Sequence, residues 1–143
     1  MKIFLDTSAL FKLYHRENGT ELIENIFNQN KITQVFISEI SKLEFASTVW
    51  KKVRMKEIDE NRSDNLIKLF ESDISKYTLL PSDNKIIESS YLLIAKYGLQ
   101  GLRTLDSIQF STALSLKEEA ELFLTFDMLL GIFFENESLN TKL

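Results

Sequence analysis

Four short, largely apolar runs recur along the chain, and a longer amphipathic stretch separates each from the next. The runs cover residues 3–5, 35–37, 77–80 and 122–125. Runs of this length are typical of strands that are buried on both faces of a parallel sheet. Parallel strands need helical crossovers, and these are right-handed. The alternation therefore predicts an α/β fold of three layers, with helices on both faces of a central sheet.

Local signals place the expected helix starts. Thr7 or Ser8 is expected to cap a helix after the first strand, because a hydroxyl can accept a hydrogen bond from a free backbone amide. Ser41 and Glu44 have the spacing of a capping box at the start of a long helix. No repeat, linker or low-complexity segment interrupts the chain, so residues 1–143 are expected to form one domain.

The residue inventory excludes several kinds of catalytic centre. The chain has no cysteine, which excludes disulfides, thiolate nucleophiles and cysteine-bound zinc, and His15 is its only histidine. A site built on several histidines is therefore impossible. Carboxylates remain as the main chemical groups for a catalytic site.

Charge and hydropathy bear on partners and location. The net charge of -4, from 17 basic and 21 acidic residues, predicts no bulk attraction to nucleic acid or anionic lipid. The longest uncharged apolar runs fall well short of the roughly 18 residues that span a bilayer. The apolar run near the N-terminus is too short for a signal peptide. We therefore expect a cytoplasmic protein without a membrane partner.

Three acids are expected at the carboxyl edge of the sheet. Asp6 and Asp127 follow strands, and Asp106 lies in the first turn of a predicted helix. Open parallel sheets bind ligands at this edge. Each acid alone has a plainer interpretation, because acids near helix N-termini offset the helix dipole. A fourth acid, Glu44, falls on the polar flank of its helix, where a capping or solvated side chain is the first interpretation.

Four segments carry these acids within recognisable patterns. They are residues 3–14 (IFLDTSALFKLY), 38–44 (SEISKLE), 102–110 (LRTLDSIQF) and 124–127 (LTFD). In this order they resemble the motifs of PIN-domain ribonucleases, and within that family the VapC toxins of toxin–antitoxin pairs. The resemblance runs from Lys2 to about Leu130, and four motifs in the family's order are far more specific than any one alone.

The resemblance implies a PIN-like domain, with a parallel sheet of four to five strands, that acts as a metal-dependent endoribonuclease. Asp6, Glu44, Asp106 and Asp127 match the acids that bind Mg²⁺ or Mn²⁺ in the family, which makes Glu44 a candidate ligand despite its place on the helix. Physical chemistry agrees, because crowded carboxylates must take up protons or hold a cation. A metal-activated water would then hydrolyse the RNA phosphodiester.

Further roles and partners follow from the same resemblance. Ser8 and Thr125 would orient a carboxylate or a metal-bound water, with a helix cap and a strand end as their plain alternatives. A cation cluster near the end of the third helix is either a solvated helix end or a track for RNA phosphates. The cluster is Lys51, Lys52, Arg54 and Lys56, which Lys12, Arg16 and Arg103 would join. As a type II toxin, the protein would bind RNA and a cognate antitoxin and form a homodimer.

Two other functions stay open at this point, and the sequence departs from the VapC-like pattern in two places. A haloacid-dehalogenase-like aspartyl phosphatase also has an aspartate after its first strand, but it expects a second one two residues later, where Ser8 stands. A non-catalytic partner-binding module of the same fold is disfavoured, because all four acid positions are filled. Gln109 stands where many VapC-like proteins carry a histidine, and the residues after Asp127 leave a final strand in doubt.

Overall fold

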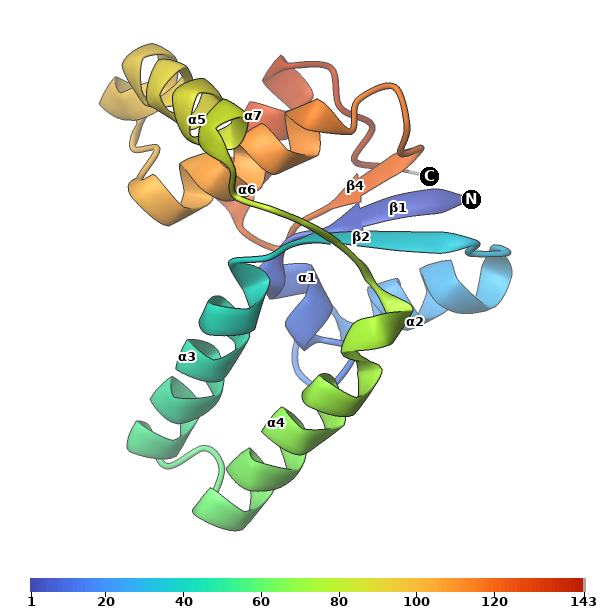
Figure 1. Cartoon of the computed structure of the whole chain (residues 1–143). Coiled ribbons are helices and arrows are strands. Elements are labelled where there is room, and N and C mark those ends of the chain that lie inside the picture. The colour runs from blue at the N-terminus through green and yellow to red at the C-terminus, as the bar shows by residue number, and fades with distance from the viewer. Residues whose placement is uncertain (143) are drawn as a thin grey trace.

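A sheet of four parallel strands forms the centre of the computed structural model, which describes residues 1–142 (Figure 1). The strands are β1 (Lys2–Leu5), β2 (Gln34–Ser38), β3 (Thr78–Leu80) and β4 (Leu122–Leu124), in the spatial order β3-β2-β1-β4. In the central strand β1, Ile3 lies opposite both Val35 of β2 and Leu122 of β4. The predicted α/β fold with a parallel sheet is confirmed.

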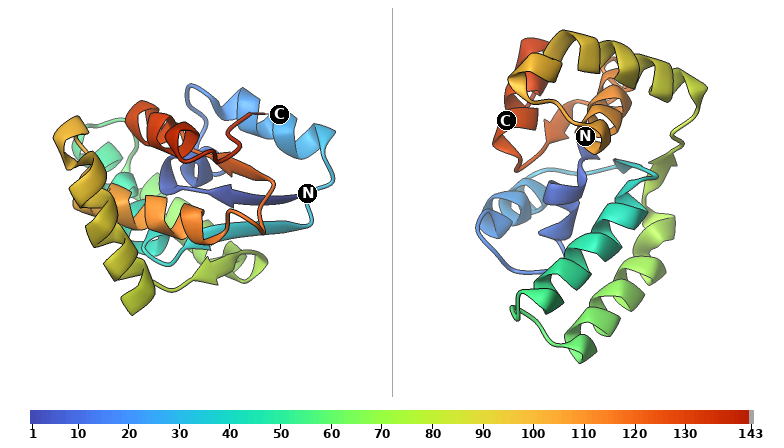
Figure 2. Two further views of the ribbon diagram at one scale, coloured as in Figure 1. Left: turned by 90° about the horizontal axis from the view of Figure 1, so that it is seen from above. Right: turned by 90° about the vertical axis from the view of Figure 1, so that its left-hand side faces the viewer.

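Helices cover both faces of this sheet. Their bounds are α1 (Thr7–Phe11), α2 (Thr20–Gln29), α3 (Ser41–Arg54), α4 (Glu60–Asp73), α5 (Asn84–Tyr97), α6 (Thr104–Ser115) and α7 (Met128–Asn136), with 3-10 turns at Ile74–Lys76 and Gly98–Gln100. In Figures 1 and 2, α1 to α4 lie on one side of the sheet and α5 to α7 on the other. No helix within residues 1–142 is long and apolar enough to cross a membrane.

The strands supply both halves of the core, because neighbouring residues of a strand point to opposite faces. Ile3 and Leu5 belong to the cluster that packs against α1 to α4. Phe4, Phe36 and Phe123, from three adjacent strands, belong to the cluster on the side of α5 to α7. Strands β1, β2 and β4 are thus largely buried on both faces, as their apolar runs predict, whereas the edge strand β3 is only partly buried.

Two predicted helix starts are wrong, and both corrections concern acids. The side chain that caps α1 is Asp6, whose Oδ1 accepts a hydrogen bond from the backbone N–H of Ala9 at 2.9 Å, rather than Thr7 or Ser8. The capping box of α3 does not form. The carboxylate of Glu44 instead accepts hydrogen bonds from side chains of α1 and α6. Both acids thus take part in contacts at the carboxyl edge of the sheet.

Candidate functional site, an acidic cleft at the carboxyl edge of the sheet

A cleft of about 550 Å³ opens at the carboxyl edge, and all four predicted acids line it. Asp6 follows β1, and Asp127 follows β4 and caps α7. Glu44 and Asp106 lie in the first turns of α3 and α6. The strand order places β2, β1 and β4 side by side, so segments that are far apart in the sequence end at one place.

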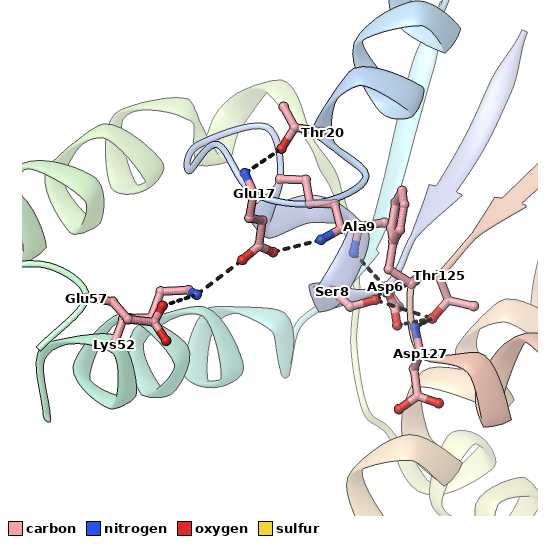
Figure 3. Close-up of polar contacts among 11 residues, drawn as sticks. Asp6, Ser8, Ala9, Glu17, Thr20, Lys52, Glu57, Thr125 and Asp127 are labelled. Carbon is pink, nitrogen blue, oxygen red and sulfur yellow. Dashed lines mark hydrogen bonds and ion pairs between the residues drawn. The ribbon is translucent and has the colours of Figure 1, made fainter. Parts of the chain in front are cut away.

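The carboxylate of Asp6 is 4% exposed and is held by three donors (Figure 3). Its Oδ1 accepts from the Ser8 hydroxyl at 2.7 Å and from the amide of Ala9, and its Oδ2 accepts from the Thr125 hydroxyl at 2.6 Å. Burial raises the pKa of Asp6 to about 6, although these hydrogen bonds favour the ionised form, and Glu44 raises it further. Ser8 and Thr125 therefore both contact a predicted metal ligand.

The same hydroxyls join the end of β4 to the start of α1. The backbone N–H of Phe126 donates to Ser8 Oγ at 2.7 Å, and the backbone N–H of Asp127 donates to Thr125 Oγ1 at 3.0 Å. The carboxylate of Asp127 accepts from the amide of Leu130 at 2.8 Å. The acids on these two segments are consequently fixed relative to each other by short hydrogen bonds.

Glu44 is held by a polar network that the sequence analysis missed. Its Oε1 accepts from Thr7 Oγ1 at 2.8 Å and from Gln109 Nε2 at 2.6 Å. The same nitrogen lies 3.0 Å from both Thr7 Oγ1 and Ser41 Oγ. Gln109 is 2% exposed and lies three residues after Asp106, so both share one face of α6. The three-residue spacing from Asp106 was the one sequence feature that could have predicted that Gln109 faces the cleft.

Each acid in the cleft repels a neighbouring acid. Burial raises the pKa of Glu44, and the charge of Asp106 raises it further. Burial also raises the pKa of Asp106, followed by the charge of Asp127, while Arg103 opposes the increase. Together with the effect of Glu44 on Asp6, these interactions link all four acids. The cleft therefore accumulates negative charge that favours protons or a bound cation.

The donor set fits a hard divalent cation in its chemistry. Mg²⁺ and Mn²⁺ prefer carboxylate oxygens, and all four acids face one cleft. Within residues 1–142, however, no three histidine or acidic side chains are gathered tightly enough to form a ready-made metal site.

One face of α3 contributes both acidic and basic side chains to the lining of the cleft. Glu44, Thr48, Lys51, Lys52 and Met55 line it, with the three- and four-residue spacing of a single helix face. The structure thus divides the predicted cation cluster, since Arg54 and Lys56 do not line the cleft, and neither does Arg103 beside Asp106.

Comparison with known proteins places this geometry in a family. The model of the PIN domain family matches residues 3–129, which is most of the chain. The chain belongs to the PIN domain family. No curated protein sequence matches this PIN domain.

Solved structures with the same fold cover nearly the whole PIN domain. They include VapC20 of Mycobacterium tuberculosis, a toxin that cleaves the sarcin–ricin loop, at a TM-score of 0.68 and 14% identity over 92% of this chain and 94% of that one. FitAcB of Neisseria gonorrhoeae has a TM-score of 0.70, with 16% identity over 98% and 96%. VapBC-1 of nontypeable Haemophilus influenzae has a TM-score of 0.65, with 18% identity over 99% and 97%. At these identities the likeness establishes the shared fold.

Gln109→Leu is expected to lower the free energy of unfolding by about 2 kcal/mol, because leucine fills a similar volume but cannot donate to the carboxylate of Glu44. The same loss should raise the pKa of Glu44 further, since the hydrogen bond favours its ionised form. Urea unfolding and an NMR titration of the Glu44 carboxyl group measure both effects.

Gln34→Leu is the matched control, because its amide donates to Thr78 at the surface. It should change stability by less than about 0.5 kcal/mol. Equal effects of the two substitutions would show that the contact with Glu44 has no special energetic role.

Proposed function

We propose that this PIN domain is a divalent-metal-dependent endoribonuclease of the VapC type, which acts as the toxin of a type II toxin–antitoxin pair. The observation that carries the proposal is the convergence of Asp6, Glu44, Asp106 and Asp127 on one cleft, where each repels a neighbour. A sarcin–ricin-loop-cleaving toxin with the same fold supports the choice of RNA as substrate.

The four acids would hold Mg²⁺ or Mn²⁺. When bound, such an ion lowers the pKa of a water for attack on phosphorus and offsets charge on the phosphate oxygens. Ser8 and Thr125 fix the orientation of Asp6 through its two oxygens. Thr7 and Gln109 fix Glu44 through Oε1, which leaves its Oε2 without a hydrogen bond from the described residues. The chain's own hydroxyl and amide groups thus set the directions of two proposed ligands.

RNA would reach this site along the basic residues. Lys51 and Lys52 are proposed to contact its phosphates within the cleft, because both line it. Arg54, Lys56 and Arg103 would contact phosphates outside it. Because the net charge of the protein is -4, its attraction to RNA must come from local groups of basic residues. Phosphate contacts of this kind make binding strongly dependent on salt.

The proposed partners besides RNA are a cognate antitoxin and a second copy of the chain, in the cytoplasm. The similarity to VapBC structures supports the antitoxin. A largely apolar groove lined by Ile40, Leu43 and Leu105 adjoins Glu44 and supports a protein contact there. An antitoxin that covers the groove and the acids would silence the enzyme.

The test is incubation of the purified protein with structured RNA in Mg²⁺, in Mn²⁺ and in chelator. Wild type should cleave with either metal and stop in chelator, and Asp106→Asn should be at least about 100-fold slower while keeping its circular dichroism spectrum. Asp64→Asn, at an exposed position of α4, makes the same charge change outside the cleft and should cleave normally. Cleavage in chelator, or by Asp106→Asn at the wild-type rate, would reject the proposal.

A further inference from the structure

Lys12 is a buried cation in the same cleft as the acids. It follows α1, is 8% exposed, and lines the cleft with Asp6 and Lys52. Burying an ammonium group costs considerable free energy unless the group is paired. A lysine in this position therefore needs partners for its charge. The N–H donors that these partners leave unused are then open to a ligand.

Two contacts hold the ammonium group of Lys12. Its Nζ donates to Glu17 Oε1 at 2.8 Å and lies 4.6 Å from the centre of the Phe126 ring. Phe126 in turn packs against Gly19, where an added Cβ would lie 2.4 Å from the ring and where φ is +92°. Glycine is thus the residue that allows the ring, and with it the lysine, to take this position.

Glu17 pairs with a second lysine as well as with Lys12. Its Oε2 pairs with Lys52 Nζ at 3.1 Å, and Lys52 also pairs with Glu57 at 2.9 Å. Although burial raises the pKa of Glu17, the hydrogen bonds from the two lysines lower it overall. In Figure 3, Glu17, Lys52 and Glu57 lie on one side of the view, and Asp6, Thr125 and Asp127 lie on the other.

The ammonium group of Lys12 keeps donor capacity to spare. An ammonium group has three N–H donors, and within residues 1–142 that of Lys12 makes one hydrogen bond, to Glu17. Because the residue lines the cleft, a ligand oxygen in the cleft can take the remaining donors without displacing Glu17. For the nuclease proposed above, the ligand that brings anionic oxygens into this cleft is the phosphodiester of RNA.

We propose that Lys12 binds a phosphate of the RNA backbone within the cleft, held in place by Glu17 and Phe126. This inference rests on the proposed nuclease function and adds a binding residue to it. The four acids repel RNA, and a fixed cation in the same cleft offsets part of that repulsion. A buried ammonium acts through a lower dielectric than the exposed lysines do, and its side chain is already ordered, so binding costs little entropy.

The test measures binding of single-stranded RNA in the Asp106→Asn background with Mg²⁺, as a function of salt. Lys12→Met should lower the affinity about tenfold, which corresponds to one charged hydrogen bond. It should also reduce the magnitude of the slope of log K against log salt by about 0.7, the value for one phosphate contact on a single strand. Lys12→Arg should keep the slope, because it keeps the charge.

Lys68→Met is the matched control, since Lys68 is exposed on α4, outside the cleft. It should change the affinity less than twofold. A folded Lys12→Met protein that binds like Lys68→Met overturns the inference, while cleavage by wild type would leave the nuclease proposal standing. Equal loss of affinity in Lys12→Met and Lys12→Arg, with lowered melting temperatures, also overturns it, because it would show a structural role. Absence of RNA cleavage by wild type would instead reject the nuclease proposal itself.

Discussion

Asp6→Asn is expected to destroy cleavage and at the same time to stabilise the metal-free protein. Cleavage should fall at least about 100-fold, because the variant loses the charge of a proposed metal ligand. Stability should rise at pH 7 by up to about 3 kcal/mol, because burial raises the pKa of Asp6 to about 6 and the ionised form is costly in the fold. Asparagine Oδ1 can still accept from Ala9 and cap α1.

The stabilisation by Asp6→Asn should depend on pH, because ionised Asp6 destabilises the fold. The folded-state pKa of Asp6 lies above the ordinary value of 3.8, so its contribution to stability is fully present below pH 3.8 and is lost as the pH rises through about 6. Urea unfolding in chelator should therefore show the advantage of Asp6→Asn growing from pH 4 to pH 7.

The matched control for this experiment is Asp83→Asn. Asp83 also caps a helix, α5, by accepting from the amide of Ile86, but it is exposed and lies outside the acidic cleft. Its replacement should leave stability nearly unchanged, because asparagine is an equally good cap. An Asp6→Asn protein less stable than wild type at pH 7 without metal would contradict the prediction.

Mn²⁺ at 100 times its dissociation constant is expected to raise the free energy of unfolding by about 2.7 kcal/mol. For a domain of this size that corresponds to a rise in melting temperature of roughly 5–10 °C. The physical reason is that one doubly charged ion relieves the repulsion that links the four acids. Differential scanning calorimetry with increasing Mn²⁺ measures the shift.

Variants identify where the ion acts. Asp6→Asn and Asp106→Asn should reduce the Mn²⁺-dependent shift, whereas Asp64→Asn on α4 should keep it. A wild-type protein whose melting temperature does not respond to Mn²⁺ would favour a non-catalytic partner-binding module with this fold over a nuclease.

The strands were predictable because their signal is local. Runs such as residues 3–5 and 122–124 are apolar throughout, and a parallel sheet buries both of their faces. The cap of α1 was not predictable in the same way. Asp6, Thr7 and Ser8 are all good caps by type, and the choice depends on Thr125 and Phe126, which contact this turn from the far end of the chain.

The sequence predicted the positions of some acids in the candidate site better than others. Asp6 and Asp127 follow strands, so the topology alone brings them to one edge. Glu44 came only from resemblance, because its helical position indicates a polar flank. Its place in the cleft depends on Thr7 and Gln109, which lie 37 and 65 residues away in the sequence, so their contacts with it leave no local pattern.

The face of α3 that lines the cleft holds its acidic and basic side chains at a fixed spacing along the helix axis. A helix rises 1.5 Å per residue, so the path from Glu44 to Lys52 is about 12 Å long and its length is set by the backbone. One residue added between them would turn the lysines by about 100° around the helix axis and away from the cleft that they line. If the proposed function is right, the number of residues in this stretch matters to RNA binding as much as their chemistry does.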